Sequence, residues 1–118
     1  MIRIKRVYEE PSPDDGTRVL VERLWPRGMS KKKAVVDRWC RDIAPSAELR
    51  KWYSHDVSKW EEFRERYLME LEGNELVSQL SSLSRRGDVT LVFAARDPEK
   101  SSAAVLLDVL ERKEAEDR

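Results

Sequence analysis

The chain has 118 residues and a mass of 13.9 kDa, which is enough for one domain and leaves no room for a second core. It carries 23 basic and 23 acidic residues, and this net charge of zero argues against a generic nucleic-acid coat protein or a disordered acidic tail. The charge is unevenly distributed, because residues 1–41 contain 11 basic and 6 acidic residues. We therefore expect residues 1–118 to form a single domain with a basic N-terminal third.

Several absences narrow the class of protein. The longest apolar stretch, residues 89–95, is far shorter than the roughly 20 residues of a membrane-spanning helix. The first residues also lack the apolar core of a signal peptide. Cys40 and His55 are the single cysteine and histidine, which excludes an internal disulfide and leaves few ligands for zinc. We therefore expect a cytoplasmic protein with no metal site, no cofactor and no membrane association.

Two strands are predicted in the N-terminal part of the chain. Residues 2–8 alternate apolar and charged side chains, which is the period of a half-buried strand, and a turn rich in proline, aspartate and glycine follows. Residues 18–25 are more continuously apolar and end at Pro26 and Gly28. The connection between these strands is short for a parallel crossover, so their pairing direction stays open.

Two helices are predicted next. The first begins with Ser30 as its N-cap and ends before Pro45. Its apolar face consists of three residues at helical spacing: Val35, Trp39 and Ile43. A short second helix is predicted directly after Ser46, which serves as its N-cap.

Two longer helices follow. The first begins at Asp56 or Ser58, carries aromatic residues at spacings of three and four, and stops at Gly73. The second begins at once, with Asn74 as its N-cap, and stops at Gly87.

The C-terminal part is predicted to contain a strand and a helix. Residues 89–95 read VTLVFAA and have no polar face, which is typical of a central parallel strand covered by helices. Asp97 and Pro98 are predicted as the N-cap and first residue of the last helix. The pattern indicates an α/β fold with a small three-stranded, mainly parallel sheet flanked by helices. We predict the strand order 2-1-3, with residues 2–8 in the middle.

Basic residues gather where the second predicted strand ends. Arg23 and Arg27 flank Trp25 at this carboxyl end, which is the edge where open α/β sheets bind ligands. Arginines hold carboxylates and phosphates in bidentate fashion. Three lysines at residues 31–33 follow in the first turn of the predicted helix, where the helix dipole disfavours cations and a bound anion relieves that cost. Ion pairing of the arginines with acidic neighbours, and simple solvation of the lysines, are the alternatives.

Further binding candidates are found at two other places in the sequence. Arg96 and Asp97 come directly after the strand at residues 89–95 and so belong to the same edge of the sheet. Trp52 and Trp25 lie outside the helical apolar stripes and are candidates for stacking on a base or a sugar. We therefore include all four residues in the predicted ligand site.

His55 and Asp56 form the one visible acid–base pair. A carboxylate beside an imidazole raises the pKa of the imidazole and fixes its tautomer, although Asp56 is equally suited to cap the following helix. The sequence contains no glycine-rich phosphate loop, no GxSxG and no HExxH motif. Cys40 is expected to be buried and structural. His55 and Asp56 are therefore the best catalytic candidates.

Three segments carry a family resemblance. They are RVLVERLWPRG at residues 18–28, the segment at residues 42–71 that begins DIAPSAELRKW, and VTLVFAARD at residues 89–97. With them the chain resembles the YeaO-like proteins, small bacterial and archaeal proteins without an established reaction, from about residue 2 to residue 110. The resemblance implies an α/β fold. It also implies that these polar and aromatic residues are shared with the family: Arg23, Trp25, Arg27, Asp42, Ser46, Trp52, His55, Asp56, Trp60 and Asp97.

Two departures from the family pattern bear on function. Ser54 stands where relatives commonly have glycine, and residues 100–102 replace an asparagine and a histidine, which shifts the weight from catalysis to binding. We therefore predict binding of an anionic ligand, such as a nucleotide, a phosphorylated metabolite or a nucleic acid, at the carboxyl ends of the strands. One alternative is a hydrolase or transferase for a phosphorylated substrate, with His55 as general acid or base and Asp56 orienting it. Another is a protein–protein adaptor anchored by exposed aromatic residues.

Overall fold

The computed structural model describes residues 1–116. Its sheet has four strands, all paired in parallel, in the order β1-β4-β2-β3. The strands are β1 (Ile2–Arg6), β2 (Thr17–Leu20), β3 (Arg38–Trp39) and β4 (Val89–Phe93). The fold is therefore α/β with a parallel sheet flanked by helices, which confirms the predicted class, with four strands instead of three.

The predicted strand order is wrong, because β4 and not β1 separates the other long strands. Leu91 of β4 is aligned with Ile4 on one side and with Val19 on the other. All five residues of β4 are buried, whereas β1 carries charged residues at alternate positions. A strand with no polar face is suited to the centre, and charged side chains are suited to an edge. β1 and β2 run in the same direction without being neighbours.

The predicted helix from Ser30 to Pro45 is also wrong. The helix α1 is one turn long (Lys31–Ala34), and Val35 ends it with a left-handed backbone, φ +48°. β3 follows and pairs with β2, because the Asp37 carboxylate accepts a hydrogen bond from the Arg18 amide at 2.8 Å and draws the chain to the sheet. The predicted N-cap is confirmed, since the Ser30 hydroxyl accepts from the Lys33 amide.

The remaining helices are close to their predicted positions. They are α2 (Ala47–Tyr53), α3 (Trp60–Leu71), α4 (Glu75–Arg86) and α5 (Ser102–Glu116). Ser46 and Asn74 cap α2 and α4 as predicted, and Asp56 caps a short turn before α3. No helix among residues 1–116 is long and apolar enough to cross a membrane.

The predicted start of the last helix is wrong by several residues. The Asp97 carboxylate accepts from the Glu99 amide at 3.0 Å and closes a turn outside the helix. The Ser101 hydroxyl accepts from the Ala104 amide at 3.1 Å and occupies the capping position of α5. Both residue types cap helices well, so the sequence alone did not distinguish them.

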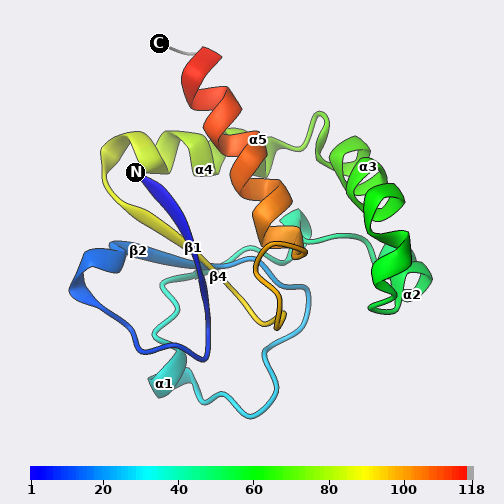
Figure 1. Ribbon diagram of the computed structural model, residues 1–118. Helices are drawn as coiled ribbons and strands as arrows, with labels where there is room; N and C mark the ends of the chain where they lie inside the picture. The colour runs from blue at the N-terminus through cyan, green and yellow to red at the C-terminus, as the bar shows by residue number, and fades with distance from the viewer. Residues whose placement is uncertain (117–118) are drawn as a thin grey trace.

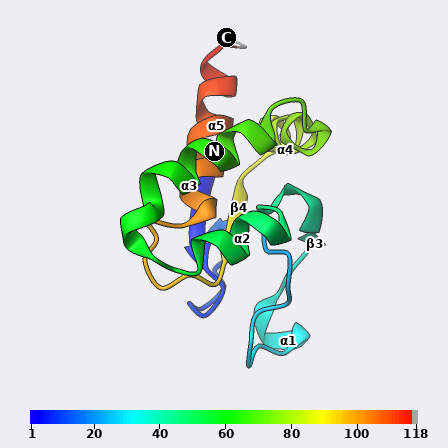
Figure 2. The same ribbon diagram turned by 90° about the vertical axis from the view of Figure 1, so that its right-hand side faces the viewer.

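The two faces of the sheet are covered differently. Helices α4 and α5 lie over one face, and α1 lies on the opposite side of the sheet (Figure 1). The helical face holds the larger core, which includes Val19, Leu91 and Phe93. The other face holds a small core built on Leu20 and Val92, with part of the segment around α1 as its cover. Figure 2 shows α1 set apart from the helical layer.

Candidate functional site

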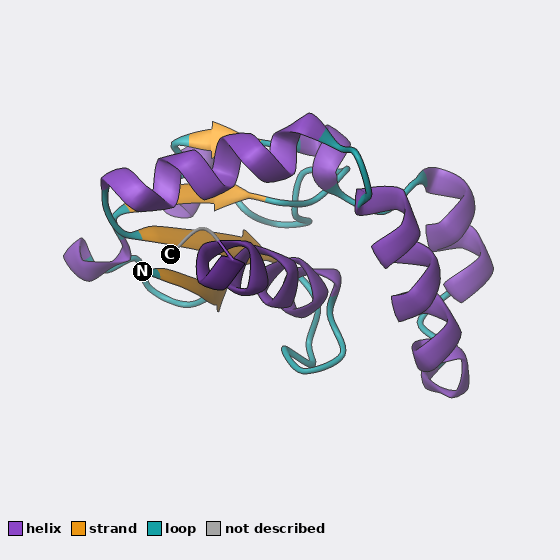
Figure 3. Ribbon diagram, turned by 90° about the horizontal axis from the view of Figure 1, so that it is seen from above, coloured by secondary structure: helices purple, strands orange, loops and turns teal. Residues whose placement is uncertain are grey.

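The carboxyl ends of the four parallel strands lie at one edge of the sheet, which we call the carboxyl edge. The strands end at Arg6, Leu20, Trp39 and Phe93. In Figure 3 the arrowheads point to the side of the molecule on which α2 and α3 lie. Ligands of open parallel sheets bind at this edge. The predicted site residues lie in the loops after β2 and β4 and on or next to the helix α2.

Arg23 is engaged with the backbone. Its Nε donates to the Pro45 carbonyl and its Nη2 to the Ala44 carbonyl, both at 3.1 Å, while Nη1 lies 3.7 Å from the Asp42 carboxylate. These contacts join the end of β2 to the chain just before α2. The guanidinium of Arg23 therefore has a structural role in holding this edge together.

Trp25 is packed into the small core. Its indole N–H donates to the Met29 carbonyl at 2.6 Å, and its ring meets the ring of Trp39 edge to face, with centroids 5.4 Å apart. The Trp39 indole in turn donates to the Glu22 carbonyl at 2.6 Å. The two tryptophans fix the loop between β2 and α1 to the sheet.

Arg27 and the lysines of α1 form what we call the basic segment, residues 27–33. The Arg27 carbonyl accepts a hydrogen bond from the Tyr8 hydroxyl at 2.9 Å, which joins this segment to the carboxyl end of β1. The Arg27 side chain and residues 31–33 are exposed, and within residues 1–116 none of these four cations has an ionic partner. One helical turn has little macrodipole, so any anion binding here depends on the side chains themselves.

Trp52 lies on α2, about 20 residues after the basic segment in the sequence. The Arg66 guanidinium stands 4.2 Å from its ring centroid and the Lys59 ammonium 5.1 Å, while the Lys59 ammonium also donates to the Trp52 carbonyl. The ring is half-buried between these cations. It therefore contributes to the contact between α2 and α3.

Arg96 and Asp97 follow β4 at the carboxyl edge, and both are exposed. The Asp97 carboxylate stabilises its own turn, as described above. It also lies close enough to Tyr53 of α2 to contribute, after burial and Asp56, to raising the pKa of the Tyr53 phenol. The charge of Asp97, after β4, thus acts on the Tyr53 phenol at the end of α2.

His55 and Asp56 lie in the turn after α2. Ser54 and His55 both have left-handed backbones, with φ of +45° and +58°. The Asp56 carboxylate accepts from both the amide and the hydroxyl of Ser58, and these bonds hold its pKa below the usual value. Within residues 1–116 no hydrogen bond joins Asp56 to the imidazole. The Asp56 side chain thus acts as a cap in this conformation.

Glu22 is a site residue that the sequence analysis missed. Its carboxylate accepts from the Ala94 amide at 2.8 Å and so bridges the ends of β2 and β4. Burial raises the pKa of this carboxyl, against the opposing effects of the Ala94 hydrogen bond and of the charges on Arg50 and His55. The Glu22 carboxylate therefore lies at the carboxyl edge, where the charges of Arg50 and His55 act on it. Glu22 directly follows the apolar residues 19–21, and this position in the sequence could have identified it as a site residue.

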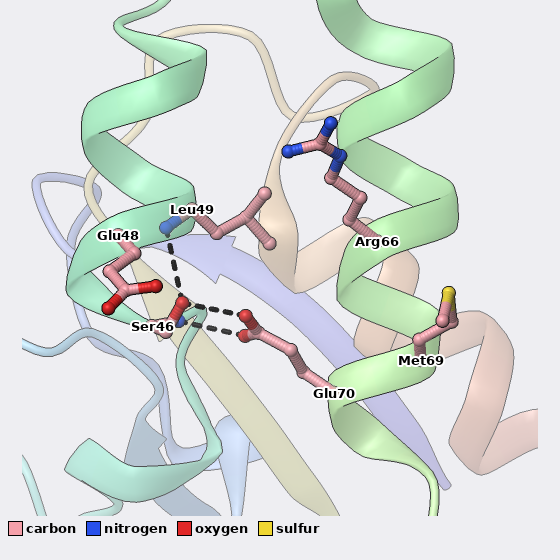
Figure 4. A pocket seen from close by; sticks show the side chains of 6 residues that line it. All are labelled: Ser46, Glu48, Leu49, Arg66, Met69 and Glu70. Atoms are coloured by element: carbon pink, nitrogen blue, oxygen red, sulfur yellow. Dashed lines mark hydrogen bonds between the residues drawn. The ribbon is translucent and has the colours of Figure 1, made fainter.

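A shallow pocket of about 390 Å³ lies between α2 and α3. Figure 4 shows its six lining residues: Ser46, Glu48, Leu49, Arg66, Met69 and Glu70. The Ser46 amide and hydroxyl both donate to the Glu70 carboxylate, at 2.8 and 2.6 Å, so the polar groups at its base are paired with each other. Ser46 alone belongs to the predicted family set. Among the described residues, no group of three His, Cys, Asp or Glu side chains is placed to hold a metal ion.

Comparisons with known proteins agree with the resemblance seen in the sequence. The chain is 47% identical over 109 residues to the uncharacterized protein Rv3073c of Mycobacterium tuberculosis, with 92% of each chain covered. It is 40% identical over 110 residues to the uncharacterized protein YeaO of Escherichia coli, covering 92% of this chain and 96% of YeaO. No solved structure matches at a significant level. A family model described as "Inactive DUF488-N3 subclade" matches residues 1–118, and the chain therefore belongs to this family of YeaO-like proteins.

Proposed function

We propose that this protein binds a phosphate-bearing ligand on the basic segment, without converting it chemically. This segment begins beside the carboxyl end of β1, at the Tyr8–Arg27 hydrogen bond, and continues into α1 on the face of the sheet opposite α4 and α5. The observation that carries the proposal is the group of four exposed cations, Arg27 and residues 31–33, without an ionic partner in the described chain. Cations held close together repel each other, and a phosphate relieves that repulsion while accepting several charged hydrogen bonds.

The backbone that bears these cations is held at several points. The Tyr8 hydroxyl binds the Arg27 carbonyl, and the Trp25 indole binds the Met29 carbonyl. The buried Arg18 side chain donates to the carbonyls of residues 34 and 35, at the end of α1. A backbone that is ordered before binding loses less conformational entropy when a ligand arrives. This supports a binding surface rather than a solvated loop.

Two observations favour binding over catalysis. The matching family is described as an inactive subclade. The predicted acid–base pair is also not assembled, because Asp56 is hydrogen bonded to Ser58 and not to His55. A hydrolase or transferase would need a different conformation of this turn.

Inorganic tripolyphosphate is a suitable first probe, because it presents phosphate charges without a base or sugar. Titration calorimetry is expected to show binding that weakens with added salt. Arg27→Ala should lower the affinity by about tenfold, the lower end of the range for one hydrogen bond to a charged group. Lys32→Ala should lower it by less. The melting temperature without ligand should stay unchanged in both variants, since both side chains are exposed.

The matched control is Lys51→Ala, which removes an exposed cation from α2. This variant should bind tripolyphosphate like the wild type. Equal binding by the wild type, Arg27→Ala and Lys32→Ala, or binding by none of them, would show that the basic segment is not the anion site.

A further inference from the structure

Tyr8 presents an exposed aromatic ring directly beside the basic segment. The residue is 44% exposed. Of the large apolar residues that are exposed within residues 1–116, it is the one with an aromatic ring. Its hydroxyl donates to the Arg27 carbonyl at 2.9 Å, so the ring is fixed next to the first cation of the segment. Sequence analysis did not single out Tyr8.

Arg6 supports the ring from one side. Its guanidinium stands 5.1 Å from the Tyr8 ring centroid and is itself held by the Ala95 carbonyl at 2.8 Å and the Ala94 carbonyl at 3.3 Å. The cation and the tethered hydroxyl together restrict the motion of the ring. A ring whose position is already fixed loses little entropy when a flat ligand group stacks on it.

We propose that the ligand of the basic segment is a single-stranded nucleic acid, with a base stacked on Tyr8 and the adjoining phosphates on Arg27 and residues 31–33. This inference rests on the proposed function and names its ligand class. Non-specific single-strand binding combines two features, aromatic rings that accept any base and a basic surface that follows the backbone. Both features occur here on segments joined by a direct hydrogen bond.

The number and arrangement of the charges favour a polymer. Four cations spread over residues 27–33 exceed what one phosphate needs, whereas a strand supplies a phosphate at every nucleotide. A duplex offers the same phosphates but keeps its bases stacked inside, out of reach of the Tyr8 ring. An anionic membrane offers phosphates without bases. The aromatic ring therefore distinguishes the single strand from both.

Two acidic residues determine on which side the strand passes. Glu9 and Glu10 follow Tyr8 and are exposed, and the Glu9 carboxylate accepts from the Arg6 amide at 2.8 Å. Their charges repel phosphates from the turn after β1. The backbone of the strand is therefore expected to leave Tyr8 on the side of Arg27.

Fluorescence anisotropy with labelled probes tests this ligand class. The probes are oligothymidine and oligouridine of about 15 nucleotides, which suits the site sizes of such proteins, a DNA duplex of equal length, and vesicles containing phosphatidylserine. Wild-type protein should bind the single strands more tightly than the duplex and the vesicles. Arg27→Ala should reduce the slope of log affinity against log salt by about 0.7 for the single strand, the value for one phosphate contact.

Substitutions at Tyr8 separate stacking from charge. Tyr8→Leu should bind the single strands about 5- to 160-fold more weakly than Tyr8→Phe, the range for one lost base–aromatic stack. Both variants lack the hydroxyl that is bonded to the Arg27 carbonyl, so the two should bind tripolyphosphate equally. Tyr8→Phe keeps the ring and removes only the hydroxyl, so it should retain the preference for single strands. Thermal melts should show that both variants are folded, because the Tyr8 side chain is exposed.

Three results would overturn the inference. The first is equal single-strand affinity in Tyr8→Leu and Tyr8→Phe. The second is equal or tighter binding of the duplex or the vesicles, which leaves the proposed anion site in place but assigns it another ligand. The third is no binding of any nucleic acid while tripolyphosphate binds in an Arg27-dependent way. If tripolyphosphate also fails to bind, the proposed function itself is wrong.

Discussion

Arg18 and Asp15 form an ion pair that is almost entirely removed from water. The two side chains are 3% and 4% exposed, and Nη1 of Arg18 lies 2.6 Å from the Asp15 carboxylate. Arg18 also donates to the carbonyls of residues 34 and 35, and Lys5 donates to Asp15 at 3.1 Å. The pair thus ties α1 to β2 and holds the backbone of the basic segment. A single polar network therefore links stability to the candidate site.

Replacing Asp15 by Asn tests this network. The variant should lose about 3–5 kcal/mol of unfolding free energy at neutral pH, because it leaves the Arg18 charge buried without its counterion. Urea melts measure the loss, and the double variant Asp15→Leu with Arg18→Met should lose less. A loss below about 1 kcal/mol would be typical of an exposed pair and would contradict the buried network.

The same residue predicts a pH dependence. Burial alone would raise the pKa of Asp15, but hydrogen bonds from Ser12, Lys5 and Arg18 outweigh it and hold the pKa below the ordinary 3.8. A carboxyl whose pKa is lower in the folded state stabilises the fold above its unfolded pKa, and this stabilisation is lost as pH falls through the folded value. Urea melts of the wild type should show that loss at acidic pH, and Asp15→Asn should lack it.

The pKa of Glu22 is shifted in the opposite direction to that of Asp15. Its pKa is raised above the ordinary 4.5 because the carboxyl is buried. The stability it contributes is therefore present at low pH and is lost as pH rises from 4.5 through the raised folded value. Glu22→Gln keeps an oxygen for the Ala94 amide and carries no charge. It should match the wild type in acid and become more stable than the wild type as pH rises.

A hydrogen-bond control accompanies this experiment. Glu22→Leu lacks the acceptor and leaves the Ala94 amide unpaired, so it should be about 1–3 kcal/mol less stable than Glu22→Gln at every pH. If Glu22→Gln instead becomes less stable than the wild type as pH rises, attraction to Arg50 and His55 outweighs burial, and the assigned direction of the Glu22 pKa is wrong.

At the scale of elements, β4 is the centre of the sheet. It pairs with β1 along its whole length and with β2 over residues 89–92, and Leu91 is completely buried. Leu91→Ala should cost about 2–5 kcal/mol in denaturant melts, because it removes buried side-chain atoms and leaves a cavity. Ile4→Ala in the edge strand β1, where the side chain is half-buried, should cost less. A loss below about 0.5 kcal/mol at Leu91 is typical of a surface site and would contradict its central position.

At the scale of the whole molecule, the sheet divides the protein into a thick and a thin layer. Helices α4 and α5 cover the larger core, whereas α1 and its flanking segment cover only a small core around Leu20 and Val92 (Figure 1). The thin layer is the one that bears the basic segment. Apolar contacts contribute less there, so the buried Arg18–Asp15 pair and the tryptophan hydrogen bonds hold this layer in place. The exposed cations of the basic segment and a buried polar framework thus occur in the same layer.

The sequence by itself determined the features that depend on near neighbours in the chain. Alternating and continuous apolar runs located three of the four strands, and the capping residues Ser30, Ser46 and Asn74 were identified from residue type and position. These features depend on backbone geometry within a few residues. They also sufficed to recognise the family resemblance and the α/β class.

Only the tertiary structure decided the strand order, the nature of residues 30–43, and the site neighbours Tyr8 and Glu22. Trp39 and Ile43 fit a helical stripe as well as they fit a two-residue strand followed by a turn, and pairing with β2 selected the strand. Tyr8 lies next to Arg27 through a hydrogen bond across 19 residues of chain, and Glu22 meets Ala94 across 72. Local periodicity contains no information on such distant pairs, because they form only when separate elements pack together.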